Sequence, residues 1–124
     1  MIYKKVYKFF SQKDGSQHIA STYALKGLEK IVKKNNVNFV FEFGIGIGTI
    51  PYLLGSIKNE LIYFGTENNG YCIEQLKLNL KDLETTFSYN HLHSFEEYTG
   101  NRKFDLIIFD GAFNDSAFLR KNSS

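Results

Sequence analysis

One stretch constrains the fold of this chain more than any other, an apolar run that leads into three alternating glycines. Residues 38–43 read NFVFEF, and the glycines follow at Gly44, Gly46 and Gly48. A short apolar run rich in Val and Phe predicts a buried β-strand, and a helical pattern begins directly after the last glycine. Glycine adopts positive φ easily and lets a ligand approach the backbone closely. The stretch therefore predicts the strand, loop and helix that open a nucleotide-binding α/β unit.

The spacing of these glycines differs from the G-x-G-x-x-G pattern of dinucleotide-binding proteins. Counted from Gly44, the third glycine of that pattern would fall at Thr49, and counted from Gly46 it would fall at Pro51. This mismatch disfavours an NAD-dependent oxidoreductase. On the motif alone, the alternative of a tight turn that binds nothing stays open.

Length, charge and cysteine content exclude several other classes of protein. The chain has 124 residues, which favours one domain with a modest core. Its net charge of +2 is too small to indicate a nucleic-acid partner, and no apolar run approaches the roughly 20 residues that span a bilayer. No signal-peptide core follows the N-terminus, and the single cysteine, Cys72, cannot form an internal disulfide. We therefore expect a cytoplasmic protein with no nucleic-acid or membrane partner.

Helices and strands are expected to alternate along the chain, which predicts an α/β domain with a parallel sheet. Residues 1–15 form an N-terminal arm that is either a short helix or a strand, and residues 116–124 form a C-terminal tail. Residues 114–124 have room for one or two helical turns. The expected helices are 16–33 with Ser16 as N-cap, 49–58, and a third that has Asn69 as its candidate N-cap and buries Ile73, Leu76, Leu80 and Leu83. The expected strands are 38–43, 61–67, 85–92 and 104–110.

An acidic residue, Glu67, ends the second expected strand. In a unit of this kind, a carboxylate at that place accepts hydrogen bonds from the hydroxyl groups of a ribose. Glu67 therefore indicates a cofactor that contains adenosine. The alternative is a solvated acid at the end of a strand.

The pattern Glu42-x-Gly44-x-Gly46-x-Gly48, with Glu67 downstream, resembles the class I S-adenosylmethionine-dependent methyltransferases. The resemblance implies that the glycine loop lies against the methionine part of S-adenosylmethionine and that Glu67 holds the ribose. It also implies that the residues after the third strand line the adenine and that the end of the fourth strand lies near the transferred methyl group. The cofactor-binding residues that it implies are Glu42, Gly44, Gly46, Gly48, Glu67, Ser94, Phe95 and Asp110.

A methyl acceptor that carries a proton at the moment of attack needs a general base. The candidates are His18, His93 and Asp110. The alternatives are an exposed helix residue for His18 and a strand-end acid that caps the next turn for Asp110. His91 and His93 share one face of a strand, either as a partly exposed pair or with one of them near the cofactor. No metal site is predicted, because these two histidines have no third ligand at a suitable spacing.

Complete members of this family have seven strands in the order 3-2-1-4-5-7-6, whereas this sequence reaches only the fourth. The resemblance thus implies an incomplete, three-layer Rossmann-like sheet in the order 3-2-1-4, flanked by helices. The fourth strand would be an apolar edge, and such an edge invites association. Three explanations stay open: the tail covers this edge, two chains pair there as a homodimer, or the sequence is a truncated form of a longer protein. Truncation or pairing is favoured. The implied function is an S-adenosylmethionine-dependent methyltransferase, or its cofactor-binding part, with an unidentified small-molecule acceptor. The alternative is a non-catalytic module of the same fold that binds a nucleoside or a protein.

Overall fold

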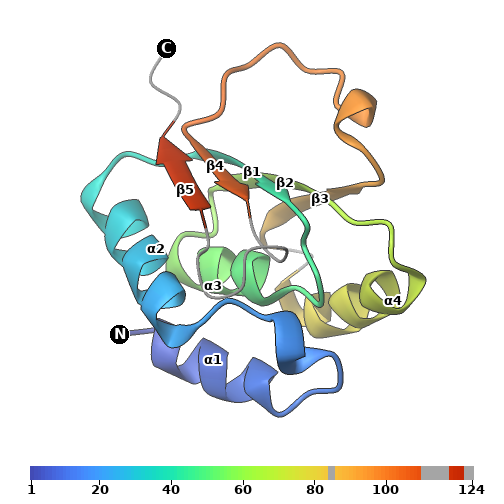
Figure 1. The fold of residues 1–124 in the computed structure, drawn as a ribbon. Helices are drawn as coiled ribbons and strands as arrows, with labels where there is room; N and C mark the ends of the chain where they lie inside the picture. The colour runs from blue at the N-terminus through green and yellow to red at the C-terminus, as the bar shows by residue number, and fades with distance from the viewer. Residues whose placement is uncertain (84–85, 110–117, 122–124) are drawn as a thin grey trace.

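A computed structural model describes residues 1–83, 86–109 and 118–121 of the chain (Figure 1). Helices and strands alternate through most of this length, as the sequence predicts. The elements are α1 (Tyr3–Ser11), η1 (Ser16–His18), α2 (Thr22–Lys34), β1 (Phe39–Phe43), α3 (Thr49–Ile57), β2 (Ile62–Thr66), α4 (Gly70–Asn79), η2 (Lys81–Leu83), β3 (Ser88–Leu92), η3 (Phe95–Glu97), β4 (Leu106–Phe109) and β5 (Phe118–Lys121).

The strands form one sheet in the order β3-β2-β1-β4-β5. The first four strands in this order are parallel, which confirms the predicted order 3-2-1-4. β5 pairs antiparallel with β4, with Leu106 opposite Lys121 and Phe109 opposite Phe118 (Figure 1). The expectation of helical turns in residues 114–124 is therefore wrong for residues 118–121.

The edge that we expected at the fourth strand is covered. β4 has β1 on one side and β5 on the other, so the backbone groups of an apolar strand are paired within the chain. A homodimer through β4, which the sequence suggested, therefore has no unpaired edge to use at that strand.

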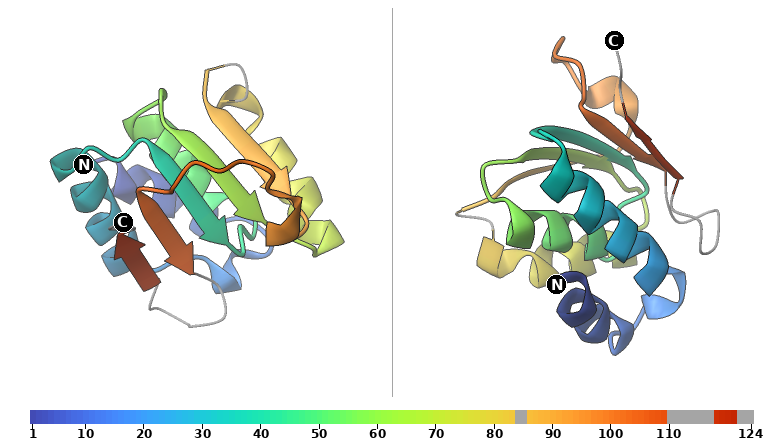
Figure 2. Two further views of the ribbon diagram at one scale, coloured as in Figure 1. Left: turned by 90° about the horizontal axis from the view of Figure 1, so that it is seen from above. Right: turned by 90° about the vertical axis from the view of Figure 1, so that its left-hand side faces the viewer.

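The main hydrophobic core lies between the sheet and the α-helices. All four described α-helices cover the same face of the sheet, as the view from above shows (Figure 2, left). Alternate strand residues point toward them, because successive side chains of a strand face opposite sides. The sheet contributes Val40, Tyr63, Leu106 and Ile108, and the helices contribute Val6, Phe10, Leu25, Leu28, Val32, Leu53, Leu54 and Leu76.

Aromatic side chains cover the other face of the sheet. Phe39, Phe41 and Phe104 are buried there, and the rings of Phe39 and Phe104 stack with centroids 4.5 Å apart. Phe95 packs edge-on against Phe41 at 5.1 Å. The third layer of the described residues is therefore the connection 93–105, which contains the 3-10 turn η3 in place of an α-helix.

The N-terminal arm is a helix, and the next helix starts later than expected. Ser21, not Ser16, is the N-cap of α2, and its Oγ accepts a hydrogen bond from the N–H of Ala24 at 3.1 Å. Ser16 instead begins the 3-10 turn η1, which follows Gly15 in the left-handed region with φ of 89°. Local chemistry alone does not separate two serines of equal capping ability.

The expected cap and stripe of α4 are largely confirmed. Asn69 caps the helix, because its Oδ1 accepts a hydrogen bond from the N–H of Cys72 at 2.9 Å. Leu76 and Leu80 are fully buried, whereas Ile73 and Leu83 are only half-buried. The α-helix ends at Asn79, and Leu83 lies in the separate turn η2.

A buried acid, Glu29 on α2, attaches α1 to the rest of the domain. Its carboxylate accepts hydrogen bonds from the N–H groups of Ile2 at 3.1 Å and Tyr3 at 2.7 Å, and Lys33 Nζ lies 2.6 Å away. These N–H groups belong to the first turn of α1, where no intrahelical acceptor is available to them. Burial alone would raise the pKa of Glu29, but the hydrogen bonds from Lys33, Ile2 and Tyr3 outweigh it and hold that pKa below its usual value.

Within the described part of the chain, none of the helices has the length and apolar character to cross a membrane.

Candidate functional site

The three glycines of the loop after β1 all have positive φ. The angles are 90° at Gly44, 65° at Gly46 and 103° at Gly48. Residues with a side chain are strained in this region, which explains why the chain has glycine at each position. A Cβ added to Gly46 would meet no atom within 4 Å, so this part of the loop faces open space. The backbone of Gly46 is therefore accessible to a ligand.

The first part of this loop, residues 44–46, is hydrogen-bonded to the carboxyl end of β2 and to Glu67. Thr66 O accepts hydrogen bonds from the N–H groups of Gly44 at 3.1 Å and Ile45 at 2.9 Å. Glu67 Oε1 accepts one from the N–H of Gly46 at 2.8 Å. The two sequence motifs, the glycine loop and Glu67, therefore meet at the carboxyl ends of neighbouring parallel strands. In open α/β sheets, ligands bind at this end.

Glu67 keeps capacity for further hydrogen bonds. Its second oxygen, Oε2, accepts from the N–H of Asn69 at 3.0 Å, so the described contacts use one acceptor position on each oxygen. A carboxylate offers about four such positions. The backbone of Glu67 is fixed by β3, since its N–H donates to Leu92 O at 3.0 Å and its O lies 2.9 Å from His91 Nε2. The carboxylate is thus held in place without being saturated.

Glu42 lies beneath the loop, in the core. It has no exposed surface, and the hydroxyl of Tyr63 donates a hydrogen bond to Oε1. Its neighbours Val40 and Tyr63 belong to the core on the helical face of the sheet. The structure therefore places Glu42 in the core, where it is hydrogen-bonded to Tyr63 of β2, and its contact with a cofactor stays a prediction.

The residues after β3 lie beside the aromatic face of the sheet. Phe95 is 47% exposed, and its ring centroid lies 5.8 Å from that of Phe43, the last residue of β1. Ser94 precedes η3 and is half-buried. The ring of Phe95 therefore stands near the carboxyl ends of the strands with one part free to contact a ligand.

The structure describes the surroundings of the three candidate bases to different extents. His93 is exposed and faces Glu97, with Nδ1 3.8 Å from Glu97 Oε2 and its own N–H donating to Glu97 Oε1 at 2.7 Å. His18 is the last residue of η1. Asp110 lies outside the described residues. Of the two histidines on β3 and its end, His91 is the one next to Glu67, and its ring lies 4.9 Å from that of His93.

Two further segments reach the glycine loop, and sequence reasoning missed both. Asn79 of α4 donates from Nδ2 to Ile47 O at 2.8 Å. A Cβ added to Gly15 would lie 3.2 Å from Ile47 Cγ2 and 3.1 Å from Tyr71 Cε2, so the turn before η1 packs tightly on the loop and on α4. Asn79 had a detectable signal, because it is a polar residue inside the apolar stripe between Leu76 and Leu80. For Gly15, the sequence Asp14-Gly15 indicates only a turn.

Cys72, in the first turn of α4, is a neutral thiol in this environment. Burial raises the pKa of its thiol, and the negative charge of Glu67 raises it further. The thiolate is the reactive form of cysteine, so these neighbours disfavour a nucleophilic role for Cys72.

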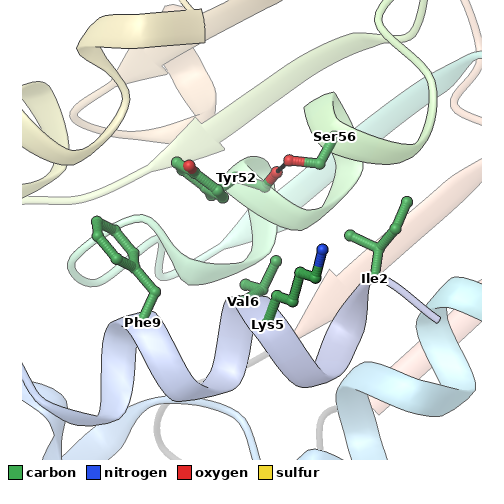
Figure 3. Close-up of a pocket in the computed structure, with 6 residues that line it drawn as sticks. All are labelled: Ile2, Lys5, Val6, Phe9, Tyr52 and Ser56. Atoms are coloured by element: carbon green, nitrogen blue, oxygen red, sulfur yellow. Dashed lines mark hydrogen bonds between the residues drawn. The ribbon is translucent and has the colours of Figure 1, made fainter.

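A separate groove lies between α1 and α3 and contains none of the predicted site residues (Figure 3). Its volume is about 400 Å³. The ring of Phe9 stacks on that of Tyr52 at 5.5 Å along one side, and Ser56 Oγ donates to Tyr52 O at 2.7 Å (Figure 3). The residues that line the groove are Ile2, Lys5, Val6, Phe9, Tyr52 and Ser56.

Among the residues that the structure describes, no three His, Cys, Asp or Glu side chains are grouped as a metal site would require.

Several solved structures with a similar fold are described as methyltransferases. A Staphylococcus aureus protein described as a candidate caffeoyl-CoA O-methyltransferase is 22% identical, with a TM-score of 0.68 over 83% of this chain and 51% of its own. The S-adenosylhomocysteine-bound Podospora anserina methyltransferase PaMTH1 is 12% identical, with a TM-score of 0.70 over 88% of this chain and 49% of its own. An S-adenosylmethionine-dependent methyltransferase from Geobacter sulfurreducens, in complex with S-adenosyl-L-homocysteine, is 15% identical, with a TM-score of 0.59 over 87% and 43%.

These comparisons establish the fold. The chain has the Rossmann-like fold of class I S-adenosylmethionine-dependent methyltransferases, and it spans about half the length of the structures that it matches. No family model matches the sequence, and no curated protein matches it.

Proposed function

We propose that this chain binds S-adenosylmethionine and forms the cofactor-binding part of a methyltransferase with a small-molecule acceptor. The observation that carries the proposal is the hydrogen bond of 2.8 Å between Glu67 Oε1 and the N–H of Gly46. It joins the two segments that resemble the family's cofactor motifs at one end of the sheet. The similar structures that carry S-adenosylhomocysteine support the choice of cofactor.

The residues at this site fit such a cofactor. The backbone at Gly46 is open to a ligand, and Glu67 has acceptor positions left for two ribose hydroxyls. The exposed part of the Phe95 ring, close to Phe43, offers a surface on which an adenine can stack. In this proposal the glycine loop contacts the methionine part, and Ser94 and Phe95 contact the adenine.

The cofactor, when bound, supplies an electrophilic methyl group on its sulfonium. The tasks left to the protein are to bind it, to orient the acceptor and to exclude water. His18, His93 and Asp110 stay the proposed bases for an acceptor that must lose a proton. His93 Nδ1 lies 3.8 Å from Glu97 Oε2, so the two side chains face each other beside the end of β3.

A second function is supported by a specific observation. The connection 93–105 covers the face opposite the helices with a single 3-10 turn, and the chain spans about half the length of the structures that it matches. A module of this kind could bind a nucleoside ligand, or a protein, without transferring a methyl group. It would bind S-adenosylhomocysteine and adenosine with similar affinity, because only the ribose and adenine contacts would matter.

Calorimetric titration of the purified chain tests the proposal. We expect micromolar binding of S-adenosylhomocysteine, much weaker binding of adenosine, and no binding of NAD. Equal affinity for adenosine and S-adenosylhomocysteine would favour the nucleoside-binding module. Binding of NAD alone, or of none of the three, would contradict the proposed function.

A further inference from the structure

The glycine loop has a directional contact on the side away from Glu67, made by Asn79 at the end of α4. Asn79 is only 8% exposed, and its Nδ2 donates to Ile47 O at 2.8 Å. A buried polar side chain needs a partner, and so does a buried carbonyl, so each group satisfies the other. This pair links α4 to the middle of the loop across 32 positions of sequence.

Apolar packing brings the two elements together but does not orient the loop. A Cβ added to Gly48 would lie 3.5 Å from Leu76 Cα and 3.5 Å from Leu80 Cγ, so the loop packs directly on the buried face of α4. Such contacts are not directional. With φ of 65° at Gly46 and 103° at Gly48, the loop is built from residues that have several accessible conformations. Hydrogen bonds to β2 and Glu67 orient the backbone at Gly44, Ile45 and Gly46. At Ile47 the directional contact is the hydrogen bond from Asn79.

The hydrogen bond from Asn79 sets the orientation of the peptide between Ile47 and Gly48. A trans peptide is planar, and its C=O and N–H point in opposite directions. Because the carbonyl of Ile47 points to α4, the N–H of Gly48 is presented on the other side of the loop. Glu67 fixes the N–H of Gly46 from β2 in a comparable way.

We propose that Asn79 is a positioning residue that fixes the glycine loop in the conformation that binds the cofactor. The inference rests on the proposed function for the identity of the ligand. Its structural part, the control of the loop by Asn79, concerns the ligand-free chain as well. The two parts can therefore be tested separately.

The first test replaces the amide by an apolar group of nearly the same shape, in Asn79→Leu. The variant leaves the carbonyl of Ile47 without its donor, so we expect affinity for S-adenosylhomocysteine to fall roughly tenfold or more. Val32→Ala is the control, because Val32 is buried on α2 and takes no part in the loop. It should lower the unfolding midpoint and leave the affinity within twofold of wild type.

The second test uses Asn79→Asp, which keeps the size and makes the donor depend on pH. The ionised carboxylate repels the carbonyl of Ile47, whereas the protonated carboxyl can donate to it. Relative to wild type at each pH, the affinity of this variant should recover as the pH falls from about 8 to about 5, since burial raises the pKa of a carboxyl into this range. Asn79→Leu should show no such recovery. A role in stability alone would not produce this difference.

The third measurement needs no ligand. In the ligand-free chain, the amide NMR signals of Gly46 and Gly48 should shift in Asn79→Leu and keep their wild-type positions in Val32→Ala. If wild type fails to bind S-adenosylhomocysteine, the proposed function fails, and these signals still decide whether Asn79 controls the loop. Unchanged glycine signals, or affinities within twofold of wild type for both Asn79 variants, would overturn the inference. If Asn79→Leu does not fold, the test of the inference is Asn79→Asp, through its pH series and its glycine signals. If neither differs from wild type, the inference is overturned.

Discussion

At the scale of single residues, Glu67 connects several parts of the site. Its two carboxylate oxygens accept from Gly46 and Asn69, and its backbone is tied to His91 and Leu92. One side chain thus joins the glycine loop, the end of β2 and the start of α4. A carboxylate in this position is fixed before a ligand arrives, which lowers the entropy that binding must offset.

Replacement of Glu67 tests its contact with the ribose. We expect Glu67→Ala to weaken binding of S-adenosylhomocysteine by about 1–3 kcal/mol, the usual range for the loss of a charged hydrogen-bond partner. Calorimetric titration measures the change. Glu74→Ala, on the exposed face of α4, is the control and should bind like wild type. An unchanged affinity of Glu67→Ala would remove Glu67 from the site.

Replacement by alanine should change the free energy of unfolding in opposite directions at two glycines. Gly46 has φ of 65°, so Gly46→Ala should lower the free energy of unfolding by about 1–2 kcal/mol through backbone strain. Gly27 lies inside α2, where a Cβ would meet no atom within 4 Å. Gly27→Ala should therefore raise the free energy of unfolding by roughly 0.5–1 kcal/mol. Urea denaturation measures both, and changes of the same sign would contradict the assignment of the loop conformation.

The sequence predicted the residues of the site that belong to a local pattern. The glycine spacing and Glu67 could be found because a strand, a loop and a helix place them at fixed distances along the chain. Asn79 and Glu29 could not be assigned in the same way, because their partners, Ile47 and Tyr3, are distant in sequence and meet them only after folding. Their common signal is a polar residue within an apolar helical stripe, which shows burial without naming the partner.

At the scale of elements, Glu29 links α1 to α2. The pKa of Glu29 is lowered, because the hydrogen bonds from Lys33, Ile2 and Tyr3 outweigh the effect of burial. A group whose pKa is lower in the folded state stabilises the fold above its unfolded pKa and loses this effect as the pH falls through its folded pKa. The contribution of Glu29 should therefore be complete at pH 7 and decline as the pH falls below the usual glutamate pKa of 4.5.

Glu29→Gln tests this attachment of α1. At pH 7 the substitution should lower the free energy of unfolding by about 1–3 kcal/mol, since the two N–H groups of α1 lose a charged acceptor. The difference from wild type should shrink as the pH falls below about 4. Urea denaturation at several pH values measures it, with Glu60→Gln, at an exposed position, as the control. A difference that does not depend on pH would show that the charge of Glu29 is not what holds α1.

Element boundaries were predictable where a local signal was strong. The sequence correctly predicts Asn69 as the cap of α4. It predicts Ser16 in place of Ser21 as the cap of α2, because the two serines have the same side chain and no local signal separates them. The strand at residues 118–121 was missed for a different reason. Its conformation depends on pairing with β4, a contact that no local propensity records.

At the scale of the whole molecule, the two faces of the sheet are covered in different ways. Helices α1 to α4 pack on one face, and the aromatic connection 93–105 packs on the other (Figure 2). The second face therefore depends on a few rings, of which Phe104 is 7% exposed and stacks on Phe39 at 4.5 Å.

Phe104→Ala tests how much this second layer contributes. Removal of a buried ring typically costs about 3–5 kcal/mol, which is a large part of the stability of a domain of this size. We expect a loss in this range by urea denaturation. Tyr98→Phe is the control, because it removes only a long, exposed hydrogen bond to Arg102 O of 3.3 Å. A loss below about 1 kcal/mol for Phe104→Ala would show that the connection 93–105 is not packed as described.

The central claim is that the glycine loop and the end of β2 form one ligand site. Titration of the ¹⁵N-labelled chain with S-adenosylhomocysteine, followed by amide NMR signals, tests it most directly. We predict the largest shifts at Gly46, Gly48, Glu67 and Phe95, with small shifts along the groove between α1 and α3. Shifts confined to that groove, around Phe9, or the absence of any shift at millimolar ligand, would contradict the claim.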